Sequence, residues 1–206
     1  MAFSAFSYPA VIADLSLSER IADLFPTVPP VVPGAAYRAV AVGAARLAQI
    51  LHTEKARSEW MVAPLLYDFW VRYDARIGLY SGVQFDADPD AGLSGVCDFV
   101  IGSAPQLPHL TAPLVVVFES KNDSIPEGFG QCISAMVGAQ RYNRKHGGAV
   151  ETVYGCATTG SSWKFLTLVG NVLTFDAAEY TFGQADKILG ILVHMVGPPP
   201  AGPSAT

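Results

Sequence analysis

The chain has 206 residues, of which 50% are hydrophobic and 15% are charged, so its composition excludes global disorder and predicts one domain with a sizeable core. Its 13 lysines and arginines against 18 acidic residues give a formal net charge of −5. That balance excludes a protein that binds nucleic acid through bulk positive charge alone, although a local basic groove stays compatible with it.

Cysteine usage and terminal composition indicate the compartment. Cys97, Cys132 and Cys156 are few and widely spaced, which predicts reduced, buried thiols rather than a disulfide framework or a structural zinc site. The N-terminus lacks the basic start and clean apolar run of a secretory signal, and the apolar run 188–196 is too short to cross a bilayer. We therefore expect a cytoplasmic protein that does not bind membranes.

The first part of the chain is expected to be mostly helical. Pro26, Pro29, Pro30 and Pro33 predict an irregular N-terminal extension over residues 1–33, with one short helical turn around 17–25. Apolar periodicity predicts a helix over 34–51 and a second over 54–73, which Pro64 is expected to kink.

The pattern then changes to that of strands. Segments rich in β-branched and aromatic residues, bounded by Gly, Asp and Pro, predict strands at 77–85, 93–101 and 114–121. The remaining expected elements are a helix at 129–145, two strands at 152–158 and 163–175, a closing helix at 183–196, and a disordered Pro/Gly tail at 197–206.

This order of elements predicts an α/β fold. Helices alternating with groups of strands favour a three-layer α/β sandwich with a central mixed β-sheet, formed by one domain over residues 34–196. Both faces of the segment Leu114–Phe118 are apolar, so it is expected to be a central strand with helices on either side.

Charged residues interrupt the apolar strands at two points. Glu119 and Lys121 end one predicted strand, and Asp98 lies in the preceding one. If the two strands form a hairpin that pairs Ile101 with Val116, Asp98 lies opposite Glu119. Two carboxylates placed in this way repel each other unless a divalent cation binds between them, because hard cations prefer carboxylate oxygens.

Two carboxylates beside a lysine suggest a specific chemistry. A bound Mg²⁺ would polarise a phosphodiester and lower the pKa of an attacking water. Lys121 would orient or deprotonate that water, or stabilise the charge that develops on the phosphorus centre. The alternative is a purely structural role, in which Asp98 and Lys121 form an ion pair and Glu119 is a solvated residue at the sheet edge.

The segments Gly95-Val96-Cys97-Asp98 and Glu119-Ser120-Lys121, with the helices and strands around them, resemble the PD-(D/E)XK nuclease superfamily over residues 54–175. The resemblance implies a restriction-endonuclease-like core and Mg²⁺-dependent hydrolysis of DNA, with Mn²⁺ as a substitute and RNA as an open alternative. It also implies that Asp98, Glu119 and the Ser120 carbonyl bind metal and that Lys121 is catalytic. Cys97 departs from the family pattern, which has proline at that position.

The resemblance points to two further residues. Many members add a metal-binding glutamate from the helix before the sheet, which matches Glu59 on the expected apolar stripe of its helix; Glu54 competes for the same role. Many also place a glutamine in the helix after the E-x-K strand, which matches Gln131, although Gln131 could instead cap that helix.

A basic cluster ends the same helix. Arg141, Arg144 and Lys145 could contact nucleic-acid phosphates, or they could simply complement the negative end of the helix dipole.

The sequence thus favours a metal-dependent nuclease and leaves two alternatives open. One is a catalytically inactive nuclease-fold protein that serves as a binding or interaction module, and the other is a different metal-dependent phosphohydrolase. A homodimer is an attractive arrangement, because cutting both strands of a duplex usually requires two active sites.

Overall fold

The computed structural model describes residues 2–148 and 150–199. Its strands are β1 (Ser18–Ala22), β2 (Gly78–Asp88), β3 (Leu93–Gly102), β4 (Leu114–Ser120), β5 (Thr152–Thr158), β6 (Ser162–Val169), β7 (Val172–Asp176) and β8 (Tyr180–Thr181). Its helices are α1 (Ala10–Asp14), α2 (Ala35–Leu51), α3 (Glu54–Arg57), α4 (Ala63–Val71), α5 (Phe129–Lys145) and α6 (Ala185–Val196). Short 3-10 turns occur at Phe3–Ala5, Pro89–Ala91, Ile125–Gly128 and Phe182–Gln184, and a π-helical turn at Ser58–Val62.

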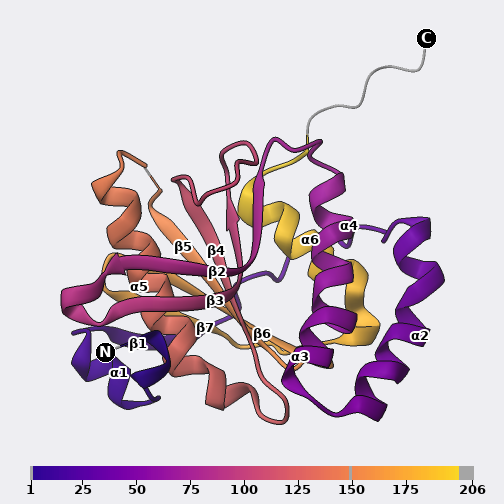
Figure 1. Ribbon diagram of the computed structural model, residues 1–206, viewed down its shortest axis with the longest axis horizontal. Coiled ribbons are helices and arrows are strands. Elements are labelled where there is room, and N and C mark those ends of the chain that lie inside the picture. The colour runs from indigo at the N-terminus through magenta and orange to yellow at the C-terminus, as the bar shows by residue number, and fades with distance from the viewer. Residues whose placement is uncertain (1, 149, 200–206) are drawn as a thin grey trace.

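Within the described residues, the eight strands form one sheet between two helical layers (Figure 1). The strand order is β1-β7-β6-β5-β4-β3-β2, and β8 pairs with β6. Helix α5 and the N-terminal segment cover one face, while α2, α4 and α6 cover the other. The pairs β4–β5 and β1–β7 are parallel and the others antiparallel, so the prediction of a three-layer α/β sandwich with a mixed sheet is confirmed.

Strand β4 lies in the middle of this sheet, as its sequence predicts. Every residue from Leu114 to Ser120 is buried, because the strand has apolar neighbours on both faces and a strand on each side. The expected antiparallel hairpin with β3 is also present, and Ile101 pairs with Val116.

Helix α5 runs back along β4. Near its C-terminus, the Asn143 side chain accepts a hydrogen bond from the Leu114 N–H and donates one to the Leu114 carbonyl, both at 2.7 Å. At its N-terminus, Gly128 lies against Glu119 and Lys121. The start of α5 is thereby placed over the end of β4.

The prediction for the N-terminal segment was wrong. Residues 18–22 form β1, which extends the sheet through parallel pairing with β7, instead of a helical turn within an irregular extension. The short polar segment carries little strand signal of its own, and pairing with the edge of a distant strand determines its conformation. Phe3 is also buried, so this segment is packed into the domain core.

The second predicted helix is divided into three parts. Between α3 and α4 the chain makes the π-helical turn Ser58–Val62, which ends just before Pro64. A π turn adds a residue to the helical repeat, so the buried positions jump from Ala56 to Met61 and Val62. The expected stripe through Glu59, Ala63, Leu66 and Trp70 is therefore wrong at its first position, since Glu59 faces solvent.

The C-terminal elements follow the prediction closely. The single strand expected over 163–175 is wrong in one respect, because a turn at Gly170, whose φ is positive, divides it into the antiparallel strands β6 and β7. Helix α6 closes the layer beside α4, as expected. Of the predicted disordered tail, residues 200–206 lie outside the described residues. Among the helices that are described, none is both long and apolar enough to span a membrane.

Candidate metal site at the end of the central strands

The end of β4 and the middle of β3 bring two carboxylates together. The register pairs Phe99 with Phe118, which places Asp98 beside Glu119, as the sequence analysis expected. The Ser120 N–H donates a hydrogen bond of 2.6 Å to Asp98 Oδ2. This backbone contact fixes the Asp98 carboxylate at the end of the strand.

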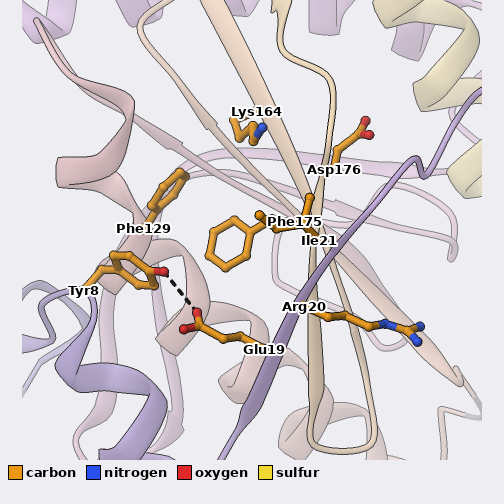
Figure 2. Close-up of a pocket in the computed structure, with 8 residues that line it drawn as sticks. All are labelled: Tyr8, Glu19, Arg20, Ile21, Phe129, Lys164, Phe175 and Asp176. Carbon is orange, nitrogen blue, oxygen red and sulfur yellow. Dashed lines mark hydrogen bonds between the residues drawn. The ribbon is translucent and has the colours of Figure 1, made fainter.

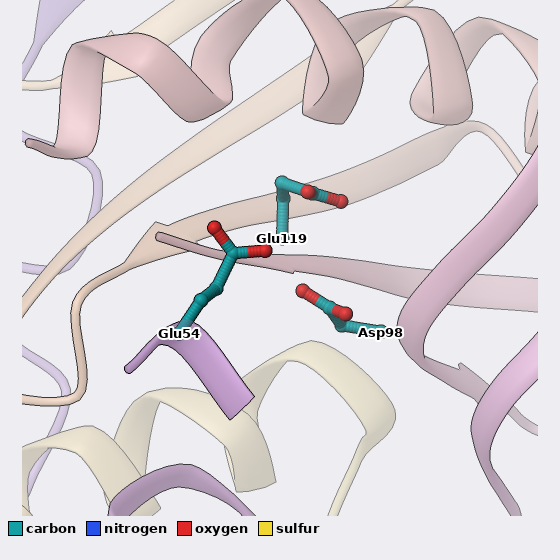
Figure 3. Close-up of side chains that lie close together, drawn as sticks. All are labelled: Glu54, Asp98 and Glu119. Atoms are coloured by element: carbon teal, nitrogen blue, oxygen red, sulfur yellow. The ribbon is translucent and has the colours of Figure 1, made fainter. Parts of the chain in front are cut away.

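A third carboxylate comes from a helix outside the sheet. Glu54 is the first residue of α3, and its oxygen, one of Asp98 and one of Glu119 all lie within 4.8 Å of one another (Figure 3). The helix begins there because Thr53 caps it, with its hydroxyl oxygen accepting a hydrogen bond from the Ala56 N–H at 3.1 Å. The three side chains thus come from three separate elements.

Lys121 completes the group. Its Nζ lies 2.6 Å from Glu119 Oε1 and 3.8 Å from Glu54 Oε1. The absence of a side chain at Gly128 leaves room for this arrangement, since a Cβ there would lie 3.2 Å from Lys121 Cγ and 3.5 Å from Glu119 Cγ. Lys121 pairs with the two glutamates, whereas Asp98 receives the Ser120 N–H, so the alternative of an Asp98–Lys121 ion pair has no support in this geometry.

Burial dominates the electrostatics of this group. Glu119 is only 4% exposed, and its burial and the charge of Asp98 raise the pKa of its carboxyl from 4.5 to about 8, despite the opposing effect of Lys121. The neighbouring carboxylates raise the pKa of Lys121, against the effect of its own burial. Without metal, burial therefore favours the protonated form of Glu119, while the surrounding carboxylates favour the charged form of Lys121.

The three carboxylates fit a divalent cation. Their oxygens are the hard donors that Mg²⁺, Mn²⁺ and Ca²⁺ prefer, and they converge from separate elements at a spacing that one ion could bridge. A cation would also favour the ionised form of Glu119, which burial alone disfavours.

A small cavity opens beside the carboxylates. It has a volume of about 240 Å³ and is lined by Glu54 and Asp98 together with Ser58, Glu59 and Gly82. Gly82 lies opposite Asp98 in the β2–β3 register, has a positive φ of 61°, and has open space where a Cβ would be. This glycine keeps the approach to Asp98 from the β2 side clear.

The structure places Glu59 outside the carboxylate cluster. Its side chain is about half exposed and pairs with Lys55 at 2.7 Å, one helical turn earlier. Because the π turn rotates this part of the helix, Glu54 joins Asp98 and Glu119 in the cluster, and Glu59 lines only the cavity. The capped helix start at Thr53-Glu54 is the sequence signal that could have favoured Glu54.

The positions of Ser120 and Gln131 are also defined. Ser120 is fully buried at the end of β4. It lies between Glu119, which is expected to bind metal, and Lys121, which is expected to be catalytic. Gln131, in the first turn of α5, donates a hydrogen bond of 3.4 Å to the Val96 carbonyl of β3. It therefore links α5 to the strand that carries Asp98 and does not cap its own helix.

The basic cluster lies far from the carboxylates. Arg141 pairs with Asp88 at 2.6 Å, and Arg144 and Lys145 are exposed in the last turn of α5. A helix of 17 residues spans about 25 Å, so this cluster and Glu119 lie at opposite ends of α5, on the order of 20 Å apart.

Arg57 is a residue that sequence reasoning missed. Its guanidinium donates to Asn122 Oδ1 at 3.1 Å, and to the Thr159 carbonyl and Ser161 Oγ at 3.2 Å. It thereby ties α3, which carries Glu54, to the segment after Lys121 and to the β5–β6 turn. A single arginine in a helix gives no sequence signal for such a role.

A second cavity, of about 440 Å³, lies near β1, and none of Glu54, Asp98 and Glu119 lines it (Figure 2). The rings of Tyr8, Phe129 and Phe175 border it with centroids 5.1–5.6 Å apart, and the Tyr8 hydroxyl donates to the Glu19 carboxylate at 3.0 Å. The packing of the N-terminal segment on α5 and β7 thus creates this cavity.

Comparison with known proteins adds no relative, because no protein-family model, curated protein or solved structure matches this chain.

Proposed function

We propose that the protein is a divalent-metal-dependent nuclease that hydrolyses DNA phosphodiester bonds at the carboxylate cluster, in the manner of the PD-(D/E)XK nucleases that its sequence resembles. The observation that carries the proposal is the convergence of Glu54, Asp98 and Glu119 within 4.8 Å, with Lys121 beside them. Such carboxylates at the end of buried strands cost free energy, which pairing with Lys121 and a bound cation would offset.

Glu54, Asp98 and Glu119 would hold the cation, and the carbonyl of Ser120 would add a further oxygen. Mg²⁺ bound there supplies Lewis-acid polarisation of a phosphoryl oxygen and lowers the pKa of an attacking water. The Asp98 carboxylate is already oriented for this role by the Ser120 N–H, and Glu54 by the start of α3.

Lys121 acts through its charge. Its ammonium is held within 2.6 Å of Glu119, so its position is fixed before substrate arrives. From there it can donate a hydrogen bond to the attacking water or to a phosphoryl oxygen on which negative charge develops. The carboxylates around it raise the pKa of Lys121 in the metal-free protein, which favours its charged form and supports a role as a hydrogen-bond donor.

The acidic cavity beside the cluster makes substrate binding depend on the cation. Glu54, Glu59 and Asp98 line it together with Lys55, which pairs with Glu59, so a net negative charge would repel an anionic phosphodiester without bound metal. The more distant Arg144 and Lys145 are exposed cations that a long duplex could reach while its phosphate lies at the cluster.

Two observations favour a second candidate, a metal-dependent phosphohydrolase that acts on small phosphoesters. The cavity of about 240 Å³ is small, and the basic cluster lies at the other end of α5. Release of phosphate from nucleotides, without cleavage of DNA, would favour this activity over the nuclease.

The experiment that tests the proposal is a cleavage assay on linear, circular and single-stranded DNA with Mg²⁺ or Mn²⁺. We expect cleavage that EDTA abolishes and that Lys121→Ala lacks, while Lys55→Ala, which removes an exposed lysine near the same cavity, keeps most of it. No cleavage of any substrate would favour the inactive binding module, and equal cleavage by Lys121→Ala would refute the role of this lysine.

A further inference from the structure

Helix α2 is more apolar than an exposed helix should be. It forms an outer flank of the molecule (right in Figure 1), and Arg38 and Arg46 are the only charged residues among its 17. Tyr37, Ala41, Ala45 and Ala48 form its buried face. A helix that is apolar on all sides is normally covered on all sides, and among residues 2–148 and 150–199 nothing covers the outer face of α2.

The outer apolar residues of α2 form one stripe. Ala36, Val40, Gly43, Leu47 and Ile50 follow each other at intervals of four, three, four and three residues. This spacing places them along one side of a helix, as in the seam between two paired helices. Val40 is 52% exposed and Ile50 is 69% exposed, so the stripe faces outward.

Gly43 is the middle residue of both the stripe and the helix. It has eight residues of α2 on either side, and a Cβ built there would meet nothing within 4 Å. The stripe is nearly symmetric about it, with Val40 and Leu47 at −3 and +4 and with Ala36 and Ile50 at −7 and +7. A glycine at such a midpoint lets a second helix approach closely.

The two halves of the stripe have complementary shapes. Beside the N-terminal half, between α2 and α4, lies a groove of about 410 Å³ that is lined by Ala36, Val40, Tyr67 and Val71. At the C-terminal half, Ile50 projects into solvent. A two-fold rotation about Gly43 exchanges the two halves, so it would bring the Ile50 of each copy to the groove of the other.

We propose that this α2–α4 face is the interface of a homodimer in which two α2 helices cross in antiparallel fashion, with the two-fold axis passing at Gly43. A second copy fits both the apolar stripe and its near-symmetry about a single residue. The proposal does not depend on the nuclease activity.

Charge and area agree with this occupant. The five stripe positions carry no charge, and Asp68, at the floor of the groove, is already paired with Arg72 at 2.7 Å. The exposed parts of Val40, Leu47, Ile50, Leu51, Tyr67 and Val71 amount to on the order of 600 Å², against roughly 800 Å² per partner in a standard interface.

The test is the mass of the full chain in solution, measured by sedimentation over a range of concentrations. We expect a dimer of twice 21.8 kDa. Gly43→Lys should weaken it at least ~30-fold, as expected for a residue at the centre of an interface, because two lysines would meet at the axis. The matched control is Val42→Lys, which changes a residue that is 78% exposed but points away from the stripe, and it should leave the dimer unchanged.

A loss of the dimer in Gly43→Lys would not result from unfolding of the monomer. Lysine at position 43 meets no neighbouring atom and is a better helix former than glycine, so the melting temperature of the monomer should not fall. Under oxidising conditions, Gly43→Cys should form a disulfide-linked dimer and Val42→Cys should not, since Cys97, Cys132 and Cys156 are buried. A monomer at every concentration, an open series of larger oligomers, or a dimer that tolerates Gly43→Lys would overturn the proposal.

Discussion

The buried carboxyl of Glu119 makes the stability of the metal-free protein depend on pH. Its pKa is about 8 in the folded protein, against 4.5 as its ordinary value. Below pH 4.5, Glu119 is protonated in both the folded and the unfolded chain, and the full stability is present. Between pH 4.5 and about 8 only the folded chain keeps the proton, so the free energy of unfolding falls as pH rises.

Glu119→Gln removes this dependence, because an amide of the same shape does not ionise. At about 1.4 kcal/mol for each pKa unit, the wild type should lose on the order of 4 kcal/mol relative to the variant between pH 5 and pH 9. For a chain of 206 residues, this corresponds to a difference in melting temperature on the order of 10 °C.

The assay is a set of thermal melts of wild type and Glu119→Gln in EDTA from pH 5 to pH 9. Glu127→Gln is the matched control, since Glu127 is an exposed glutamate in the turn just before α5, and its melting curve should follow that of the wild type. A difference between wild type and Glu119→Gln that stays constant with pH would refute the argument that burial holds the proton on Glu119.

Two further predictions concern catalysis and substrate binding. Glu119→Ala and Lys121→Ala should each reduce cleavage by on the order of 10²-fold or more, as measured by initial rates on plasmid DNA, because each removes a positioned charge at the reaction centre; circular dichroism checks that the fold is kept. Neutralising Arg144 and Lys145 should flatten the salt dependence of DNA binding by roughly one unit of slope per phosphate contact, and neutralising Arg141, which Asp88 already engages, should do less. An unchanged salt dependence of DNA binding would mean that the three residues only complement the negative end of the helix dipole.

The sequence was informative wherever the structure depends on local pattern. The apolar run of β4, the hairpin register at Ile101 and Val116, and the bounds of α5 follow from periodicity and flanking residues. The pairing of Asp98 with Glu119 follows in turn from that register. The core of the candidate site was therefore predictable.

The errors have non-local causes. Strand β1 exists because β7 offers it an edge 150 residues later along the chain, which no pattern within Ser18–Ala22 indicates. The π turn changes the phase of the helix in its middle, so an extrapolated stripe chose Glu59 where the geometry favours Glu54. The contacts of Arg57 join three segments and could be recognised only from the fold.

The most direct test of the central claim measures divalent-cation binding to the wild type and to three variants by titration calorimetry and by thermal melts. At ten times the dissociation constant, Mg²⁺ or Ca²⁺ should stabilise the wild type by about 1.4 kcal/mol, which is a shift of a few degrees. Glu59→Gln should behave like the wild type, Glu54→Gln should bind about tenfold or more weakly, and Asp98→Asn should be at least as stable without metal and should not respond to it. A wild type that ignores millimolar Mg²⁺, Mn²⁺ and Ca²⁺ alike, or an Asp98→Asn variant that binds the cations normally, would contradict a metal site at Glu54, Asp98 and Glu119.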